Sequence, residues 1–186
     1  MKQSKLGEGF NYRDQQPENE QEVIDLLQSE FEQFIKWTDV VPPKRKESLF
    51  WECDYDEQLY LDTALNHIFK YFQNLAELDS RVVTQIVYVI ACNHEQGNIL
   101  AWMNSELPIS YLSMSIRQFK YLARIILRNT EADERAVFQV VAIFRKLNPS
   151  EIDEEEISLL EQHQYHESEF VRDQVATTME HISNLK

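Results

Sequence analysis

Residues 79–92 read DSRVVTQIVYVIAC, and this stretch decides between a helical and a strand-based fold. Its many β-branched residues favour a strand by propensity alone. However, Asp79 or Ser80 can cap a helix that begins here, and the apolar residues recur at helical spacing. These apolar residues are Val82, Val83, Ile86, Val87, Val89 and Ile90. Because they leave almost no polar face, the stretch predicts a helix in the centre of the core.

A second stretch of the chain is similar to the first. Residues 135–144, RAVFQVVAIF, align without a gap with residues 81–90, RVVTQIVYVI, and share the arginine, the glutamine and the apolar positions. This similarity indicates duplication of a helical unit. We expect both segments to be helices, and we expect Val87 and Val140 to be buried in the core.

Capping residues divide the rest of the chain into further helices. The capping pairs are Asn19 with Glu22, Asp54 with Glu57, Thr130 with Asp133 and Ser150 with Asp153, and Ser168 opens the last helix. With apolar stripes of period near 3.6, they predict helices over 20–38 and 110–128, one from about 150 to 162, two more that begin near 54 and 130, a final one from 168, and a short one between Gly97 and Pro108.

Glycine is nearly absent from the chain, since Gly97 is the only glycine after residue 9. Tight hairpins and phosphate-binding loops, which need glycine at fixed positions, are therefore excluded over most of the sequence. We predict an all-α fold of seven or eight helices with no sheet. Residues 1–17 are polar and end at Pro17, so we interpret them as a loosely ordered N-terminal arm. Residues 18–186 are then a single all-helical domain.

The last predicted helix carries a family resemblance. Its residues 167–176, ESEFVRDQVA, resemble the second helix of a HEAT repeat, in which a polar start is followed by Val-Arg and by an alanine in the packed stripe. The earlier helices lack the usual proline and aspartate of that repeat. The resemblance implies stacked helical pairs, an irregular or HEAT-like α-solenoid array, whose usual role is to present a surface to another macromolecule.

The charge balance bears on the class of partner. The chain has 18 Lys and Arg against 32 Asp and Glu, a net charge of −14. Nucleic acid is therefore an unlikely partner, because phosphate neutralisation needs a surplus of cations, whereas a basic protein suits this charge. The two cysteines form no CxxC motif, no apolar leader opens the sequence, and the longest apolar run is 86–92. We expect a soluble cytoplasmic protein with no membrane contact.

Catalytic and metal-binding patterns are weak. His163, His166 and Glu167 have spacings that would bring them together on a continuous helix, but they fall between two predicted helices, so we interpret them as polar linker residues. No nucleophile motif is present. We expect no cofactor and no metal, and we take the protein to be non-enzymatic.

A basic stripe is predicted on the helix over 110–128, formed by Arg117, Lys120, Arg124 and Arg128. At 100° per residue these four cations lie within about 80° of one another. They could hold an anionic ligand. The alternative, which we prefer, is a solvated face whose cations pair with acids of neighbouring helices.

The predicted binding surface is the segment WECDYDE at 51–57, where acids and aromatic residues alternate before a helix. Aromatic rings flanked by carboxylates can anchor a basic protein surface. The predicted contact residues are Glu52, Asp54, Tyr55, Asp56, Glu57 and Tyr60. In the alternative interpretation, Trp51 and Tyr55 only cover the edge of the core. If this surface fails, the next candidates are the acids of the C-terminal helices, Glu155, Glu156 and Glu161.

In size, charge and composition the chain is similar to the helical immunity proteins with which bacteria neutralise nuclease toxins. The similarity implies a protein that sequesters a basic partner, possibly a nuclease toxin, by covering its positive cleft with acids. A second hypothesis is a helical-repeat adaptor in a larger assembly. A third is an enzyme acting on nucleic acid, as some HEAT-like DNA glycosylases do, which would require the basic stripe to face a cleft beside a carboxylate.

Overall fold

The computed structural model describes residues 17–46, 55, 58–92 and 114–184. Within them the chain is helical and contains no strand, so the predicted all-α class is confirmed. The helices are α1 (Glu20–Val40), α2 (Pro43–Lys46), α3 (Gln58–Tyr71), α4 (Ser80–Cys92), α6 (Ile116–Arg128), α7 (Glu134–Phe144), α8 (Glu154–Gln162) and α9 (Glu169–Asn184), with short 3-10 turns η2 (Leu75–Glu77), η3 (Pro149–Glu151) and η4 (His163–Tyr165).

Several predicted features lie outside the described residues. They are residues 1–16 of the predicted arm, the capping pair Asp54 and Glu57, and the short helix expected before Pro108. The helix expected from residue 110 begins later, at Ile116, because Ser115 and Gln118 form a capping box there.

The duplicated segments begin in the same way. Asp79 accepts the amide of Arg81 at 2.8 Å at the start of α4, and Asp133 accepts the amide of Arg135 at 2.9 Å at the start of α7. Each aspartate satisfies an amide that has no partner within its own helix. Both segments are helices, so periodicity prevails over their β-propensity, and α4 and α7 pack directly on each other.

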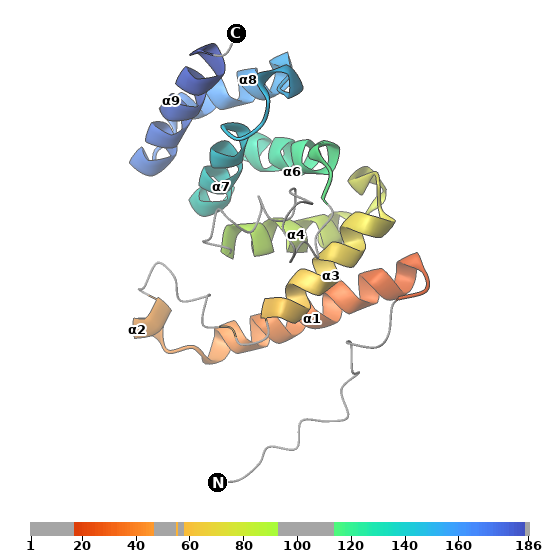
Figure 1. The fold of residues 1–186 in the computed structure, drawn as a ribbon. Helices are drawn as coiled ribbons and strands as arrows, with labels where there is room; N and C mark the ends of the chain where they lie inside the picture. Colours follow the sequence, from red (N-terminus) through yellow and green to blue (C-terminus); the bar gives the residue numbers. More distant parts are fainter. Residues whose placement is uncertain (1–16, 47–54, 56–57, 93–113, 185–186) are drawn as a thin grey trace.

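The helices follow one another across the molecule, from α1 and α3 at one end to α8 and α9 at the other (Figure 1). Helix α1 packs on α3, α4 on α7, and α7 on α9, while α6 contacts both α7 and α8. The buried apolar residues of these helices form one continuous core. No helix among the described residues is both long and apolar enough to cross a membrane.

Helices α3, α6 and α8 bury side chains at the same sequence spacing, i, i+3, i+4 and i+7, which we call the common register. The buried residues are Leu61, Ala64, Leu65 and Ile68 in α3, then Phe119, Leu122, Ala123 and Ile126 in α6, then Glu156, Leu159, Leu160 and His163 in α8 and η4. Two polar residues, Glu156 and His163, therefore occupy core positions that are apolar in the other two helices. Such residues need partners inside the protein.

Val140 is 1% exposed, as predicted, whereas the prediction for Val87 is wrong. Val87 is only partly buried and packs against the margin of the core. It follows the fully buried Ile86 by one residue, which turns it about 100° round the helix toward the exposed Tyr88. The nearly uniform apolar composition of α4 concealed which residues face outward.

Gln118 joins α6 to the end of α3. Its side-chain amide donates to the carbonyl oxygens of Phe69 at 2.8 Å and Phe72 at 2.7 Å. Its Oε1 accepts the amide of Ser115 at 2.6 Å. This buried glutamine therefore caps the carboxyl end of one helix and the amino end of another, and it fixes the position of α6.

Candidate functional site

The predicted binding surface lies mostly beyond the described residues, since Glu52, Asp54, Asp56 and Glu57 are not among them. Tyr55 is described and is only 6% exposed. Its ring centroid lies 5.2 Å from that of Phe34 and 5.2 Å from that of Trp37. Tyr55 therefore belongs to the edge of the core, as the alternative interpretation expected. Tyr60 is partly buried on α3, and a partner contact through the four acids stays a prediction.

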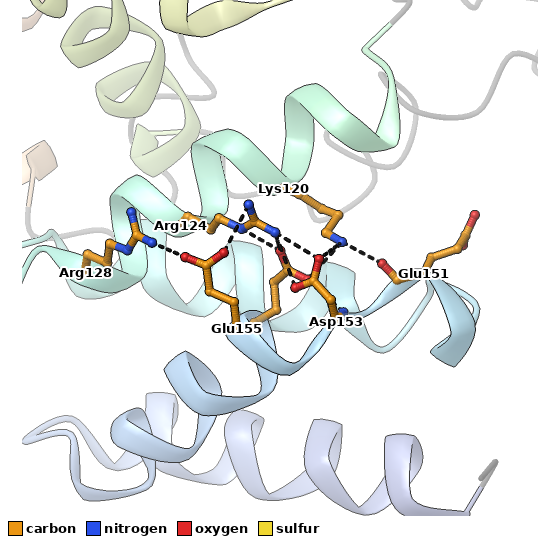
Figure 2. A network of polar contacts seen from close by, with 7 residues as sticks. Lys120, Arg124, Arg128, Glu151, Asp153 and Glu155 are labelled. Carbon is orange, nitrogen blue, oxygen red and sulfur yellow. Dashed lines mark hydrogen bonds and ion pairs between the residues drawn. The ribbon is translucent and has the colours of Figure 1, made fainter.

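The basic stripe of α6 faces the acids at the start of α8 (Figure 2). The Lys120 ammonium lies 2.8 Å from Asp153 Oδ2 and 2.9 Å from Glu156 Oε2. It also donates to the carbonyl oxygen of Glu151 at 2.9 Å. All three donor hydrogens of the ammonium are therefore used within the protein.

The two arginines of the stripe extend this network along α8. The Arg124 guanidinium contacts Asp153 Oδ2 at 3.0 Å and Glu155 Oε2 at 3.1 Å, and its Nε donates to Glu156 Oε1 at 2.6 Å. Arg128 pairs with Glu155. Three cations of α6 thus meet three carboxylates at the start of α8. For these cations, the structure confirms the interpretation as a paired structural face.

Two members of the network have shifted pKa values. Hydrogen bonding with Glu156 and with Lys120, aided by the nearby positive charges, holds the pKa of the Asp153 carboxyl well below its ordinary value. Burial acts to lower the pKa of Lys120, but hydrogen bonds to Asp153 and Glu156 outweigh it and raise the pKa. Both partners of this ion pair are therefore held in their charged forms, and the network is a structural clamp between α6 and α8.

Of the fallback acids, Glu156 is buried and cannot contact a partner, Glu155 is engaged by arginines, and Glu161 is exposed. Glu156 is 0% exposed because it takes a core position in the register, and Glu155 is partly buried between two arginines. Glu161, in the last turn of α8, is exposed. The sequence EEE at 154–156 gave no sign of this difference, since all three residues suit the first turn of a helix.

A groove of about 430 Å³ lies beside the stripe. Its lining includes Arg117, Lys120 and Arg124, together with Glu151 and the polar residues Gln73 and Asn74. This is the arrangement that the enzyme hypothesis required, a stripe facing a cleft beside a carboxylate. However, Lys120 and Arg124 are neutralised by α8, and Arg117 is the only cation of the stripe with no ion pair in the described part of the chain. The groove therefore lacks the dense positive charge that nucleic acid needs.

The predicted linker histidines have structural contacts. His163 Nε2 lies 2.8 Å from the carbonyl oxygen of Leu127, and its ring stacks on His166 at 5.5 Å. The amide of Ser168 donates to Nδ1 of His166 at 3.1 Å. Burial, followed by the charge of His166, lowers the pKa of His163. No group of three possible metal ligands occurs among the described residues.

The turn between α8 and α9, together with the first turn of α9, presents the most exposed aromatic residues of the described chain. Tyr165 is 88% exposed and Phe170 is 77% exposed. Exposed carboxylates surround them in sequence, and within the described residues none of these acids pairs with a cation. We call this set the terminal surface; its residues are Glu161, Tyr165, Glu167, Glu169, Phe170 and Asp173.

Sequence reasoning missed the terminal surface, although the signal was available. Residues 161–173, EQHQYHESEFVRD, alternate acids with aromatic residues much as 51–57 do. Tyr55 is buried and Tyr165 is exposed, a difference that depends on long-range packing and cannot be deduced from local composition. Comparison of the chain with protein-family models, with curated proteins and with solved structures finds no match.

Proposed function

We propose that this protein is a non-enzymatic acidic binding protein whose partner is a basic protein. The observation that carries the proposal is the division of charge around α8. The acids on the side facing α6 neutralise the basic stripe, while the acids beyond it, from Glu161 to Asp173, remain exposed and unpaired in the described chain. The exposed charge at this end is therefore strongly negative, in a chain whose net charge is −14.

The more specific form of the proposal is an immunity protein that covers the positive cleft of a nuclease toxin. A nuclease must hold phosphates with Lys and Arg, so its cleft is complementary to a cluster of carboxylates. Opposite charge accelerates encounter, and an acidic protein in the cleft excludes the nucleic acid. The size of the chain, its acidity and its helical fold support this form.

The test compares three probes in fluorescence anisotropy: a labelled oligo-arginine peptide, a glycine-serine peptide of equal length, and a short DNA duplex. We expect binding to the basic peptide alone, with an association rate that falls as salt rises, because the screening length shrinks to about 8 Å at 0.15 M. Preference for the duplex would refute the proposal and favour the nucleic-acid enzyme. The nuclease form is tested by adding the protein to basic toxin nucleases and measuring DNA and RNA cleavage.

A helical-repeat adaptor is the second candidate function. The observation that favours it is the succession of α4, α7 and α9, each packed on the next, together with the common register of α3, α6 and α8. These features support a HEAT-like stack. An adaptor should bind two proteins at once, so co-purification of a ternary complex on size-exclusion chromatography would favour it over an inhibitor with one partner.

A further inference from the structure

We infer that the terminal surface is the docking site for the basic partner, with Tyr165 and Phe170 as anchors and the surrounding acids as the charge complement. This inference rests on the proposed function and names its site and the chemistry of its partner. It places the contact at the end of the molecule formed by α8 and α9, opposite the end formed by α1 and α3 (Figure 1).

The two aromatic side chains are displayed on a turn whose backbone is held. His163 anchors the start of the turn to the carbonyl of Leu127 on α6. At its other end, the Arg172 guanidinium donates to the carbonyl oxygens of His166 and Glu167, each at 2.7 Å. The only cation of the segment is thus used to fix the turn. Rigid aromatic anchors lose little conformational entropy on binding, which suits them to an interface centre.

The acids lie on both sides of these anchors. Glu161 is one helical turn before Tyr165, Glu167 is in the turn itself, and Asp173 follows Phe170 by three residues, so it shares a face of α9 with that ring. Each of them is exposed. Val171 and Val175 take the buried positions of α9, so Phe170, one residue before Val171, points to solvent.

The partner that fits is a protein segment carrying several arginines or lysines. Their aliphatic stems can pack on the rings of Tyr165 and Phe170, and an arginine head can stack on an aromatic face while it pairs with a neighbouring carboxylate. A neutral apolar partner would leave the acids buried without counter-charges, which is costly. Charge complementarity therefore selects a basic occupant over an apolar one.

The experiment measures the affinity of a labelled oligo-arginine peptide for three kinds of variant. In the first, Tyr165→Ser and Phe170→Ser are combined, with Val40→Ser, another highly exposed apolar residue, as control. In the second, Glu161, Glu167 and Glu169 are changed to Gln. The third is a matched control that removes the same charge elsewhere, at Glu20, Glu131 and Glu134, which are also exposed.

We expect the aromatic double variant to weaken binding by about tenfold, mainly through faster dissociation. We expect the terminal acid variant to slow association at least about threefold more than the matched control, with circular dichroism unchanged throughout. Equal effects of the two acid variants, with no effect of the aromatic variant, would overturn the inference while the proposed function stands. A parent protein that binds no basic probe would instead refute the proposed function. Self-association that the aromatic variant abolishes would also overturn the inference, because the occupant would then be a second copy.

Discussion

Replacement of Glu156 by Gln tests whether the clamp between α6 and α8 is a main source of stability. Glu156 is fully buried and accepts hydrogen bonds from both cations, Lys120 and Arg124. Its other contact is the amide of Asp153, at 2.9 Å, which it caps. Glutamine has nearly the same shape and keeps an acceptor for this amide, so the variant removes charge with little change in packing.

The magnitude follows from the two bonds that lose their charge. A hydrogen bond to a charged group stabilises by about 1.5–3 kcal/mol, and one between neutral groups by about 0.5–1.5 kcal/mol. The glutamine oxygen can replace only one of the two carboxylate oxygens. If it keeps the Asp153 amide, the bond to Lys120 weakens by about 1 kcal/mol, while the amide NH2 faces Arg124 and that bond, worth about 1.5–3 kcal/mol, is lost. The change also leaves three cations of α6 facing two carboxylates, Asp153 and Glu155. We expect the free energy of unfolding to fall by about 3 kcal/mol, which corresponds to about 6–12 °C in Tm at this chain length.

The assay is urea denaturation followed by far-ultraviolet circular dichroism, with Glu154→Gln as the control. Glu154 lies in the same helical turn and is exposed, so its change should cost about 0.5 kcal/mol or less. Glu156→Ala, which also removes the cap and opens a cavity, should cost about 3–5 kcal/mol. A Glu156→Gln protein with the same denaturation midpoint as the Glu154→Gln control would show that this buried carboxylate does not stabilise the fold as argued.

Three other predictions follow from the packing. Gln118→Leu should lower the free energy of unfolding by about 2–3 kcal/mol in urea denaturation, because it leaves carbonyls at the end of α3 without their buried donor. Val140→Ala should lower the free energy of unfolding by about 1–3 kcal/mol, and Val87→Ala should lower it clearly less, because Val87 is only half-buried. Equal denaturation midpoints for the two variants would contradict the assignment of Val140 to the core and Val87 to its margin. Because the pKa of His163 is lowered in the folded protein, its neutral form stabilises the fold fully above the ordinary value of 6.5, and this stabilisation is lost as the pH falls below it. His163→Gln should therefore reduce the fall in Tm between neutral and mildly acidic pH.

Much of the fold could be predicted from capping residues and apolar period. Asn19 starts α1 at the predicted place, whereas α7 and α8 begin three residues later than predicted, because Asp133 and Asp153 cap them in place of Thr130 and Ser150. These are local signals, since a cap and its helix lie within a few residues of each other. The alignment of the two central helices was also informative, because α4 and α7 prove to be packed together.

The polar members of the core could not be predicted in this way. Glu156 lies among capping acids, and His163 follows the end of a helix, where both residues usually meet solvent. Their burial becomes apparent only when α8 is packed against α6, where Glu156 meets Lys120 and Arg124 and His163 meets Leu127. The burial of Tyr55 could not be predicted for the same reason: Tyr55 and Tyr165 have similar neighbours in sequence, but the first is packed against Phe34 and the second is exposed.

The two polar residues at core positions, Glu156 and His163, influence where the terminal surface lies. Apolar faces that pack together can slide with little loss, whereas a set of directional ion pairs favours one position of the two helices. The clamp at Glu156 and the contact of His163 with Leu127 fix α8 against α6 at its start and at its end. The turn that carries Tyr165 and Phe170 leaves from that second point, so its position relative to the rest of the molecule is set by these polar contacts. The same acids that neutralise the stripe thereby help to fix the position of the exposed aromatic residues.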